Sequence, residues 1–180
     1  MPSTPPENLD VQIGLLSRLR ESDAEQLAQA TQASLSHLQP FMPWATPEAT
    51  ALSAQQEYAR LAQEKWDGDA EYIYLLRHAA GGPVLGSFGL HRRIEPDAIE
   101  IGYWLHVDHV GHGYATAAAG GLTKVALAMP DINRVEIHTD EANVASAAIP
   151  RRLGYRLDRV DVGPPETKAA TGRLQIWIKN

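Results

Sequence analysis

Two glycines, Gly111 and Gly113, are separated by one residue in the segment Val110–Thr116. This segment lies between a run with strand character and an alanine-rich stretch with helical spacing. Glycine lets a backbone come close to a ligand, and the start of a helix offers free N–H groups and a positive dipole end. This pattern favours a phosphate or pyrophosphate site. A tight strand-to-helix turn that binds nothing has the same pattern, so both interpretations stay open at this point.

Two common nucleotide-binding fingerprints do not fit this segment. A dinucleotide-binding fingerprint needs a third Gly or Ala where Thr116 stands, and an acidic residue at the tip of a strand about 20 residues later. A P-loop needs Gly-Lys followed by Ser or Thr, and the chain has no such sequence.

Hydrophobic periodicity divides the rest of the chain into helices and strands. Four helices are expected, at Ser22–Leu38, from Thr46 to Asp67, at Gly113–Met129 and at Asn143–Leu153. The first has the capping-box pattern, with Ser22 at the N-cap and Glu25 three residues on. Short connections predict an antiparallel meander followed by one strand–helix–strand unit, an α+β fold. Seven strands are expected, at Val11–Leu19, Tyr72–Arg77, Val84–Arg92, Ile99–Val107, Arg134–Thr139, Tyr155–Val162 and Arg173–Lys179.

The composition is that of an ordinary globular protein. A chain of 180 residues suits one domain, so we expect a flexible N-terminal tail over residues 1–8 and a single domain over residues 9–180. The net charge of −6 argues against an extended nucleic-acid-binding face, and no apolar run approaches the roughly 20 residues of a membrane span. Without cysteine, disulfides and a thiol nucleophile are excluded. We expect a cytoplasmic protein with no nucleic-acid or membrane partner.

Several motifs in order along the chain resemble the GNAT superfamily of N-acetyltransferases, in particular its RimJ/RimL-like branch. Val110–Ala115 is similar to the acetyl-CoA-binding loop of that family, although its first position, usually Arg or Gln, is Val here. The likeness covers nearly the whole chain after the tail. The other similar motifs are Leu19–Ala24, Pro40–Trp44, Glu100–Leu105, Gly113–Thr116, Asn143–Ser146 and Leu153–Tyr155.

The resemblance implies a GNAT fold with acetyl-CoA as cosubstrate and no metal. The sheet would be mixed, mostly antiparallel and seven-stranded, flanked by about four helices, with a V-shaped splay between strands 4 and 5. The pantetheine arm would lie in that splay against strand backbone and the side chain of Asn143, and the pyrophosphate would lie on the glycine loop. The cofactor-binding residues implied are Leu105, His106, Val107, Gly111, His112, Gly113, Tyr114, Ala115, Thr116, Asn143 and Ser146.

Acetyl transfer needs a group that protonates the departing CoA thiolate. The resemblance gives this role to Ser146, which could also be merely a serine in the first turn of a helix, and Asn143 is a natural N-cap for the same helix. Related enzymes place a tyrosine four residues further on, where this chain has Pro150. Pro150 cannot donate to the carbonyl of Ser146, so we expect a slightly opened first turn.

The amine must also lose a proton, and Glu100 is the first candidate for the base. On an alternating strand Glu100 shares a face with Gly102 and Trp104, and burial in a partly dry cleft would raise its pKa, or it could act through a water. The alternative is a solvent-facing glutamate at a sheet edge. His138 is the rival base, because imidazoles titrate near neutrality. The alternation Glu136, His138, Asp140 could also be a solvated strand face. The other histidines show no metal-ligand spacing.

We therefore expect an acetyl-CoA-dependent N-acetyltransferase that acts directly on a primary amine, either the N-terminal α-amine of a protein or a small-molecule amine. An α-amine is about one-tenth neutral at pH 7, whereas a lysine is neutral about once in 2,000, so a weak base suits the former. The acceptor pocket would come from Phe41–Trp44, Trp66 and the C-terminal strands, unless these aromatics are core. The alternatives are a non-catalytic GNAT-like sensor or interaction module that binds acyl-CoA, and a plain protein-interaction domain. A homodimer is possible.

Overall fold

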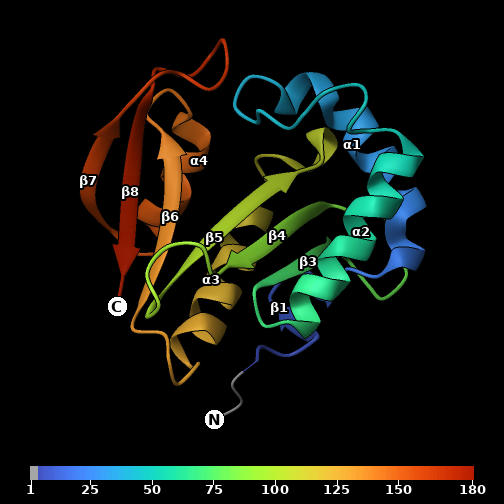
Figure 1. Cartoon of the computed structure of the whole chain (residues 1–180), viewed down its shortest axis with the longest axis horizontal. Coiled ribbons are helices and arrows are strands. Elements are labelled where there is room, and N and C mark those ends of the chain that lie inside the picture. The colour runs from blue at the N-terminus through green and yellow to red at the C-terminus, as the bar shows by residue number, and fades with distance from the viewer. Residues whose placement is uncertain (1–3) are drawn as a thin grey trace.

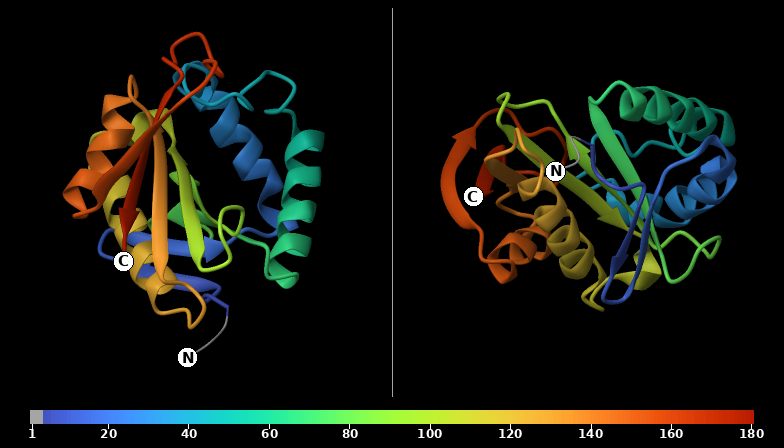
Figure 2. Two further views of the ribbon diagram at one scale, coloured as in Figure 1. Left: turned by 60° about the vertical axis from the view of Figure 1, so that its left-hand side comes forward. Right: turned by 90° about the horizontal axis from the view of Figure 1, so that it is seen from below.

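A computed structural model describes residues 4–180, and in this range the chain forms one eight-stranded sheet with helices on both of its faces (Figures 1 and 2). The strand order is β1-β2-β3-β4-β5-β6-β8-β7. The strands are β1 Asn8–Val11, β2 Gly14–Arg18, β3 Glu71–Arg77, β4 Gly86–His91, β5 Ala98–Leu105, β6 Arg134–Asp140, β7 Arg156–Val162 and β8 Arg173–Lys179. The helices are α1 Ala24–Leu38, α2 Leu52–Asp67, α3 Tyr114–Leu127 and α4 Val144–Arg152, with 3₁₀ turns at Glu21–Asp23 and Val107–His109.

The topology confirms the expected α+β fold. Strands β1 to β5 form an antiparallel meander, β5 and β6 are parallel, and β8 lies antiparallel between β6 and β7. The expected count of seven strands was one too low, because the segment predicted as one strand from Val11 to Leu19 is part of a hairpin. The chain reverses at Gln12 and Ile13, and Val11 pairs with Gly14. Neither Gln12 nor Ile13 is a typical turn former, so Gly14 at the end of the turn is the one weak signal for this reversal.

Part of the predicted N-terminal tail contributes to the sheet. Residues 1–3 lie outside the described range. Glu7 accepts hydrogen bonds from the guanidinium groups of Arg18 (2.9 Å) and Arg20 (2.6 Å), and the Tyr74 hydroxyl donates to the carbonyl of Pro6 (2.8 Å). Asn8 then begins β1. The sheet therefore begins inside the segment for which a flexible tail was expected.

Two helix starts differ from the prediction. The capping box predicted on Ser22 and Glu25 does not form, because Glu21–Asp23 make a 3₁₀ turn and the Asp23 carboxylate accepts from the backbone N–H of Arg20 (2.8 Å). Helix α2 begins at Leu52 rather than Thr46. The Thr46 hydroxyl does accept from the N–H of Ala49 (3.2 Å), but this turn is cut off from the helix by the extended backbone of Ala51.

The two faces of the sheet are covered by different helices. Helices α1 and α2 lie on one side of the central strands and α3 lies on the other (Figure 2). Alternate residues of β3 and β4 divide between the two sides: Ile73 and Leu75 belong to the cluster formed with α1 and α2, whereas Tyr74 and Phe88 belong to the larger core that includes α3. None of the helices in the described part of the chain has the length and apolar character that a membrane span requires.

The sheet opens between β5 and β6, as expected. The two strands pair only over Ala98–Glu100 and Arg134–Glu136. Beyond this point β5 stays paired with β4 and β6 stays paired with β8, so the two strands diverge (Figure 1). The resulting V separates the C-terminal half of β5 from the C-terminal half of β6.

Candidate active site

The loop before α3 presents backbone N–H groups to open space. Gly111 and Gly113 both have left-handed backbone conformations, with φ of 78° and 81°. A Cβ atom at either glycine would meet no protein atom within 4 Å. Gly113 is the N-cap of α3 and gives the helix no side-chain cap, so the N–H groups of the first turn keep their donors free. This geometry suits an anion such as a diphosphate.

The side chains of this loop point in different directions. His112 is exposed beside the glycines, and Thr116 is half-buried in the first turn of α3. The Tyr114 hydroxyl lies 3.5 Å from Nε2 of His78, and the Ala115 side chain is part of the core. Ala115 therefore offers a ligand only its backbone.

The unpaired half of β5 directs backbone groups into the splay. At the start of the strand the Asp97 carbonyl accepts from the N–H of Arg134 on the β6 side (3.2 Å), and at its end the His106 N–H donates to the carbonyl of Leu85 on the β4 side (2.8 Å). The backbone N–H and carbonyl groups of successive residues in a strand point alternately toward one neighbouring strand and the other. In β5 those of the odd-numbered residues therefore point toward β6 and the splay. In its unpaired half these are Ile101, Tyr103 and Leu105.

The three residues predicted to pair with a pantetheine arm are thus not equivalent. The N–H of His106 is used by Leu85, and the N–H of Val107 donates to the Ser34 hydroxyl (3.0 Å). Leu105 keeps both its N–H and its carbonyl directed toward the splay. Of the three, it alone offers a ligand both a donor and an acceptor there.

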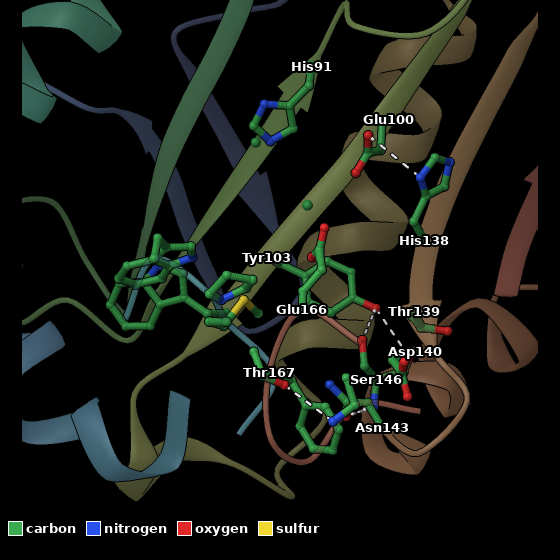
Figure 3. A pocket seen from close by; sticks show the side chains of 18 of the residues that line it. His91, Glu100, Tyr103, His138, Thr139, Asp140, Asn143, Ser146, Glu166 and Thr167 are labelled. Carbon is green, nitrogen blue, oxygen red and sulfur yellow. Dashed lines mark hydrogen bonds and ion pairs between the residues drawn. The ribbon is translucent and has the colours of Figure 1, made fainter. Parts of the chain in front are cut away.

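Asn143 caps α4, as predicted. Its Oδ1 accepts from the N–H of Ser146 at 3.2 Å, which leaves the amide NH₂ group of the same side chain available to donate (Figure 3). The Ser146 hydroxyl donates to the Tyr103 hydroxyl at 3.3 Å, and Tyr103 in turn donates to the backbone carbonyl of Ser146 at 3.2 Å. Burial raises the pKa of Tyr103 to about 12, so the phenol stays protonated at neutral pH.

A cavity of about 1050 Å³ lies over the sheet face that α1 and α2 cover, and it reaches Asn143 and Ser146. One wall is the apolar segment Phe41–Trp44, where the Trp44 and Trp104 rings lie 6.2 Å apart. The loop between β7 and β8 forms another wall. Trp66, also expected near an acceptor, belongs instead to the core and packs edge-on against Tyr72 and Tyr74.

Glu100 faces this cavity at the apex of the V, but its carboxylate is held in place. The Arg93 guanidinium donates to both oxygens, at 2.8 and 2.7 Å (Figure 3 shows the position of Glu100). Burial alone would raise the pKa of Glu100, but the Arg93 hydrogen bond and the positive charges of Arg93 and His138 outweigh it and lower the pKa. The expectation of a raised pKa was wrong, because the sequence did not reveal this arginine partner.

His138 also lines the cavity, between two carboxylates. Its Nε2 lies 2.6 Å from Glu136, and its Nδ1 lies 3.8 Å from Glu100. The Glu136 side chain is only 2% exposed and is also held by Arg134 (2.8 Å). A solvated strand face, the alternative for this stretch, was therefore wrong.

Residues 15–156 match the acetyltransferase (GNAT) domain family. The chain belongs to the GNAT acetyltransferase family. A relative known from sequence, YdaF of Bacillus subtilis (strain 168), is assigned by name to the ribosomal N-acetyltransferases. It is 35% identical over 75 residues, which span 41% of this chain and 41% of that protein.

Several solved GNAT structures share the fold. RimL, a ribosomal L7/L12 α-N-protein acetyltransferase solved with coenzyme A, superposes with a TM-score of 0.86 at 21% identity and covers 96% of this chain and 97% of its own. The ribosomal-protein-S5-alanine acetyltransferase of Vibrio fischeri gives 0.85 at 15% identity, covering 96% and 95%. The microcin C7 self-immunity acetyltransferase MccE, solved with acetyl-CoA and AMP, gives 0.84 at 19% identity, covering 99% and 97%.

The structure adds site residues that were missed in the sequence. Glu71 and His91 share the cavity face with Glu100, because Glu71 pairs with His91 and His91 with Glu100 across neighbouring strands. The alternation of side chains between the two sheet faces, combined with the pairing of residues across strands, would have identified them. That pairing is not visible in the sequence. Arg93 and Glu166 enter from loops, where no periodicity operates. Within residues 4–180, no group of three or more acidic or histidine side chains is arranged to hold a metal ion.

Proposed function

We propose that this GNAT protein transfers the acetyl group of acetyl-CoA directly to a primary amine, and that the acceptor is the N-terminal α-amine of a protein. The observation that carries the proposal is the cavity that runs from the aromatic segment Phe41–Trp44 to Ser146 at the splay. It gives an amine on one side of the sheet access to a thioester that lies between β5 and β6. The names of RimL and YdaF, which refer to ribosomal-protein acetylation, support this acceptor class.

The cofactor site follows from the free backbone groups around the splay. The pyrophosphate of acetyl-CoA binds the N–H groups from Gly111 to Ala115, with the Thr116 hydroxyl beside them. The pantetheine pairs with the backbone of Leu105, and the Asn143 amide NH₂ donates to one of its carbonyls. Structures of the same fold solved with CoA and with acetyl-CoA support acetyl-CoA as the ligand.

Ser146 protonates the CoA thiolate as it leaves. Its hydroxyl stands at the start of α4, on the α4 side of the splay, and is hydrogen-bonded to the neutral phenol of Tyr103. Tyr103 accepts from this hydroxyl and so fixes its position before transfer. Glu100, whose charge is balanced by Arg93, forms part of the cavity floor.

An acceptor screen tests the proposal. Peptides with free N-termini, the same peptides with blocked N-termini, lysine-containing blocked peptides and cationic small molecules are each incubated with acetyl-CoA, and free CoA thiol and product mass are measured. We expect CoA release and a gain of one acetyl group only with free N-termini. Release with small molecules alone would assign a different acceptor. Tight acetyl-CoA binding without release from any acceptor would indicate a sensor, and no binding in calorimetry would indicate an interaction domain.

A further inference from the structure

We propose that His91, oriented by Glu71, accepts the proton that the acceptor amine loses before it attacks the thioester. This inference rests on the acetyl transfer proposed above, and it assigns to a specific nitrogen atom a role for which Glu100 and His138 are poorly placed. The two side chains come from neighbouring strands, β3 and β4, where Glu71 and His91 are directly opposed.

The hydrogen bond between the two residues fixes the state of the imidazole. Nδ1 of His91 is hydrogen-bonded to Oε1 of Glu71, and Oε2 of Glu71 accepts from Lys65 at 2.8 Å. Burial would raise the pKa of Glu71, but these two partners outweigh it and lower the pKa to about 2. An ionised carboxylate can only accept, so Nδ1 must donate. In the neutral imidazole Nε2 is then the nitrogen with a free lone pair.

Nε2 lies over a trough of two glycines on the cavity floor. Gly89 and Gly102 are opposed across β4 and β5. A Cβ at Gly102 would lie 3.1 Å from Nε2 of His91, and a Cβ at Gly89 would collide with the same ring. No side chain or backbone group of residues 4–180 forms a hydrogen bond with Nε2, and His91 is labelled on the cavity side of β4 in Figure 3. The lone pair therefore faces space that a substrate or water can occupy.

The trough is adjacent to the place of transfer. Gly102 and Tyr103 are consecutive in β5, so they face opposite sides of the sheet. Gly102 forms the floor under His91, and Tyr103 reaches the Ser146 hydroxyl on the other side. The proposed proton acceptor, His91, and the proposed proton donor, Ser146, thus lie on opposite sides of β5. The edge of β5 that is unpaired in the splay lies between them. A general base can reach its proton directly or through one water.

Most of the other titratable groups around His91 are already engaged. Glu166, from the loop between β7 and β8, lines the same cavity without a hydrogen bond to residues 4–180, and the test below includes it as the rival proton acceptor. Both Glu100 oxygens accept from Arg93, and both His138 ring nitrogens face carboxylates. Lys65 is bound to Glu71. Tyr58 of α2 also lines the cavity, where its phenol O–H is a hydrogen-bond donor. His91 is therefore the group on this face with an unused acceptor nitrogen.

The proton balance is simple. The ammonium group of the acceptor gives one proton to Nε2, and the neutral amine attacks the thioester carbonyl carbon to form the new C–N bond. When the C–S bond breaks, the CoA sulfur gains the proton of the Ser146 hydroxyl. The second proton of the nitrogen passes through water to the Ser146 oxygen and restores the hydroxyl. His91 then releases its proton to solvent. The carboxylate of Glu71 stabilises the transient imidazolium.

The test compares His91→Gln and Glu71→Gln with His37→Gln, a matched change at an exposed position of α1. We expect His91→Gln to lower kcat/KM about 100-fold, the effect typical of a lost general base. We expect Glu71→Gln to lower it about 10-fold, and the double variant to be no worse than His91→Gln, because the two residues act as one unit. His37→Gln should keep wild-type activity, and calorimetry should give all variants the same affinity for acetyl-CoA.

Two readouts separate proton transfer from a structural role. The rise of kcat/KM through the pH range in which imidazoles titrate should disappear in His91→Gln. Added imidazole should restore part of the rate in His91→Ala but not in Ser146→Ala. If the wild type acetylates the acceptor and His91→Gln keeps both its rate and its pH profile, this inference is overturned and the proposed function stands. The role of His91 is equally overturned if Glu166→Gln, rather than His91→Gln, removes the rise. If the wild type releases no CoA with any acceptor, the proposed function itself fails.

Discussion

The hydroxyl of Tyr103 donates a hydrogen bond to the backbone carbonyl of Ser146, across the splay of the sheet. In a regular helix that carbonyl would accept from the residue four positions later, which is Pro150 and has no N–H. The strand residue therefore replaces a hydrogen bond that the helix cannot make. The same hydroxyl accepts from the Ser146 side chain, so one phenol fixes both the first turn of α4 and the aim of its serine.

This relationship predicts the effect of Tyr103→Phe. The Ser146 carbonyl would lose its partner in a partly buried place, and we expect a loss of about 1 to 2 kcal/mol in the free energy of unfolding. We also expect kcat to fall about 10-fold, because the serine hydroxyl loses its acceptor. Chemical denaturation and CoA-release kinetics measure the two effects.

Pro150→Ala gives the control for this prediction. Alanine restores an N–H that can donate to Ser146, so Tyr103→Phe should cost less stability in that background than in the wild type. An equal cost in both backgrounds would show that the tyrosine does not compensate for the proline.

Ser146→Ala tests the proposed acid. The helix cap depends on the backbone N–H of Ser146 and on Asn143, and both remain in the variant. We therefore expect the Kd for acetyl-CoA to change less than twofold while kcat falls at least 10-fold. Ser36→Ala, an exposed change on α1, is the matched control. An unchanged kcat would mean that water or another group protonates the thiolate.

Gly113→Val tests the anion site. Valine would be strained at a φ of 81°, and its side chain would fill the open space above the loop. We expect a loss of at least 10-fold in affinity for acetyl-CoA, measured by calorimetry. Gly81→Val carries a similar strain, at a φ of 73° with open space around it, in the loop between β3 and β4. This control should destabilise the fold without lowering the affinity for acetyl-CoA. If both changes lower that affinity equally, the effect of Gly113→Val comes from backbone strain and not from a lost anion site.

The parts of the fold and site that were predicted correctly from the residues are those marked by a pattern within a few positions of the sequence. Asn143 is the N-cap of α4 because its side chain reaches the N–H three residues on, and Gly113 is the N-cap of α3. Strand β8 has the predicted limits, since alternation and flanking loops mark both ends. The family resemblance supplied the splay, which no local pattern indicates.

The parts that were missed depend on register between strands. Glu100 was placed correctly on a cavity face, but its pKa depends on Arg93, seven residues earlier in a loop whose path the sequence does not specify. Glu71 and His91 meet because a strand pair brings together residues 20 positions apart. Parity identifies which residues of one strand share a face, but only register shows which residues of two strands touch.

The pairing of Glu71 with His91 and Lys65 also predicts a pH dependence of stability. The pKa of Glu71 is lowered from 4.5 to about 2, so the native state favours the ionised carboxylate more than the unfolded state does. This contribution is therefore complete above pH 5 and is lost as the pH falls through the folded-state pKa. We expect Glu71→Gln to reduce the free energy of unfolding by about 1 to 3 kcal/mol at pH 7. Urea denaturation of both proteins at pH 7, 4 and 2.5 should show the difference shrinking at each step. A constant difference across these pH values would mean that the glutamine loses packing rather than charge.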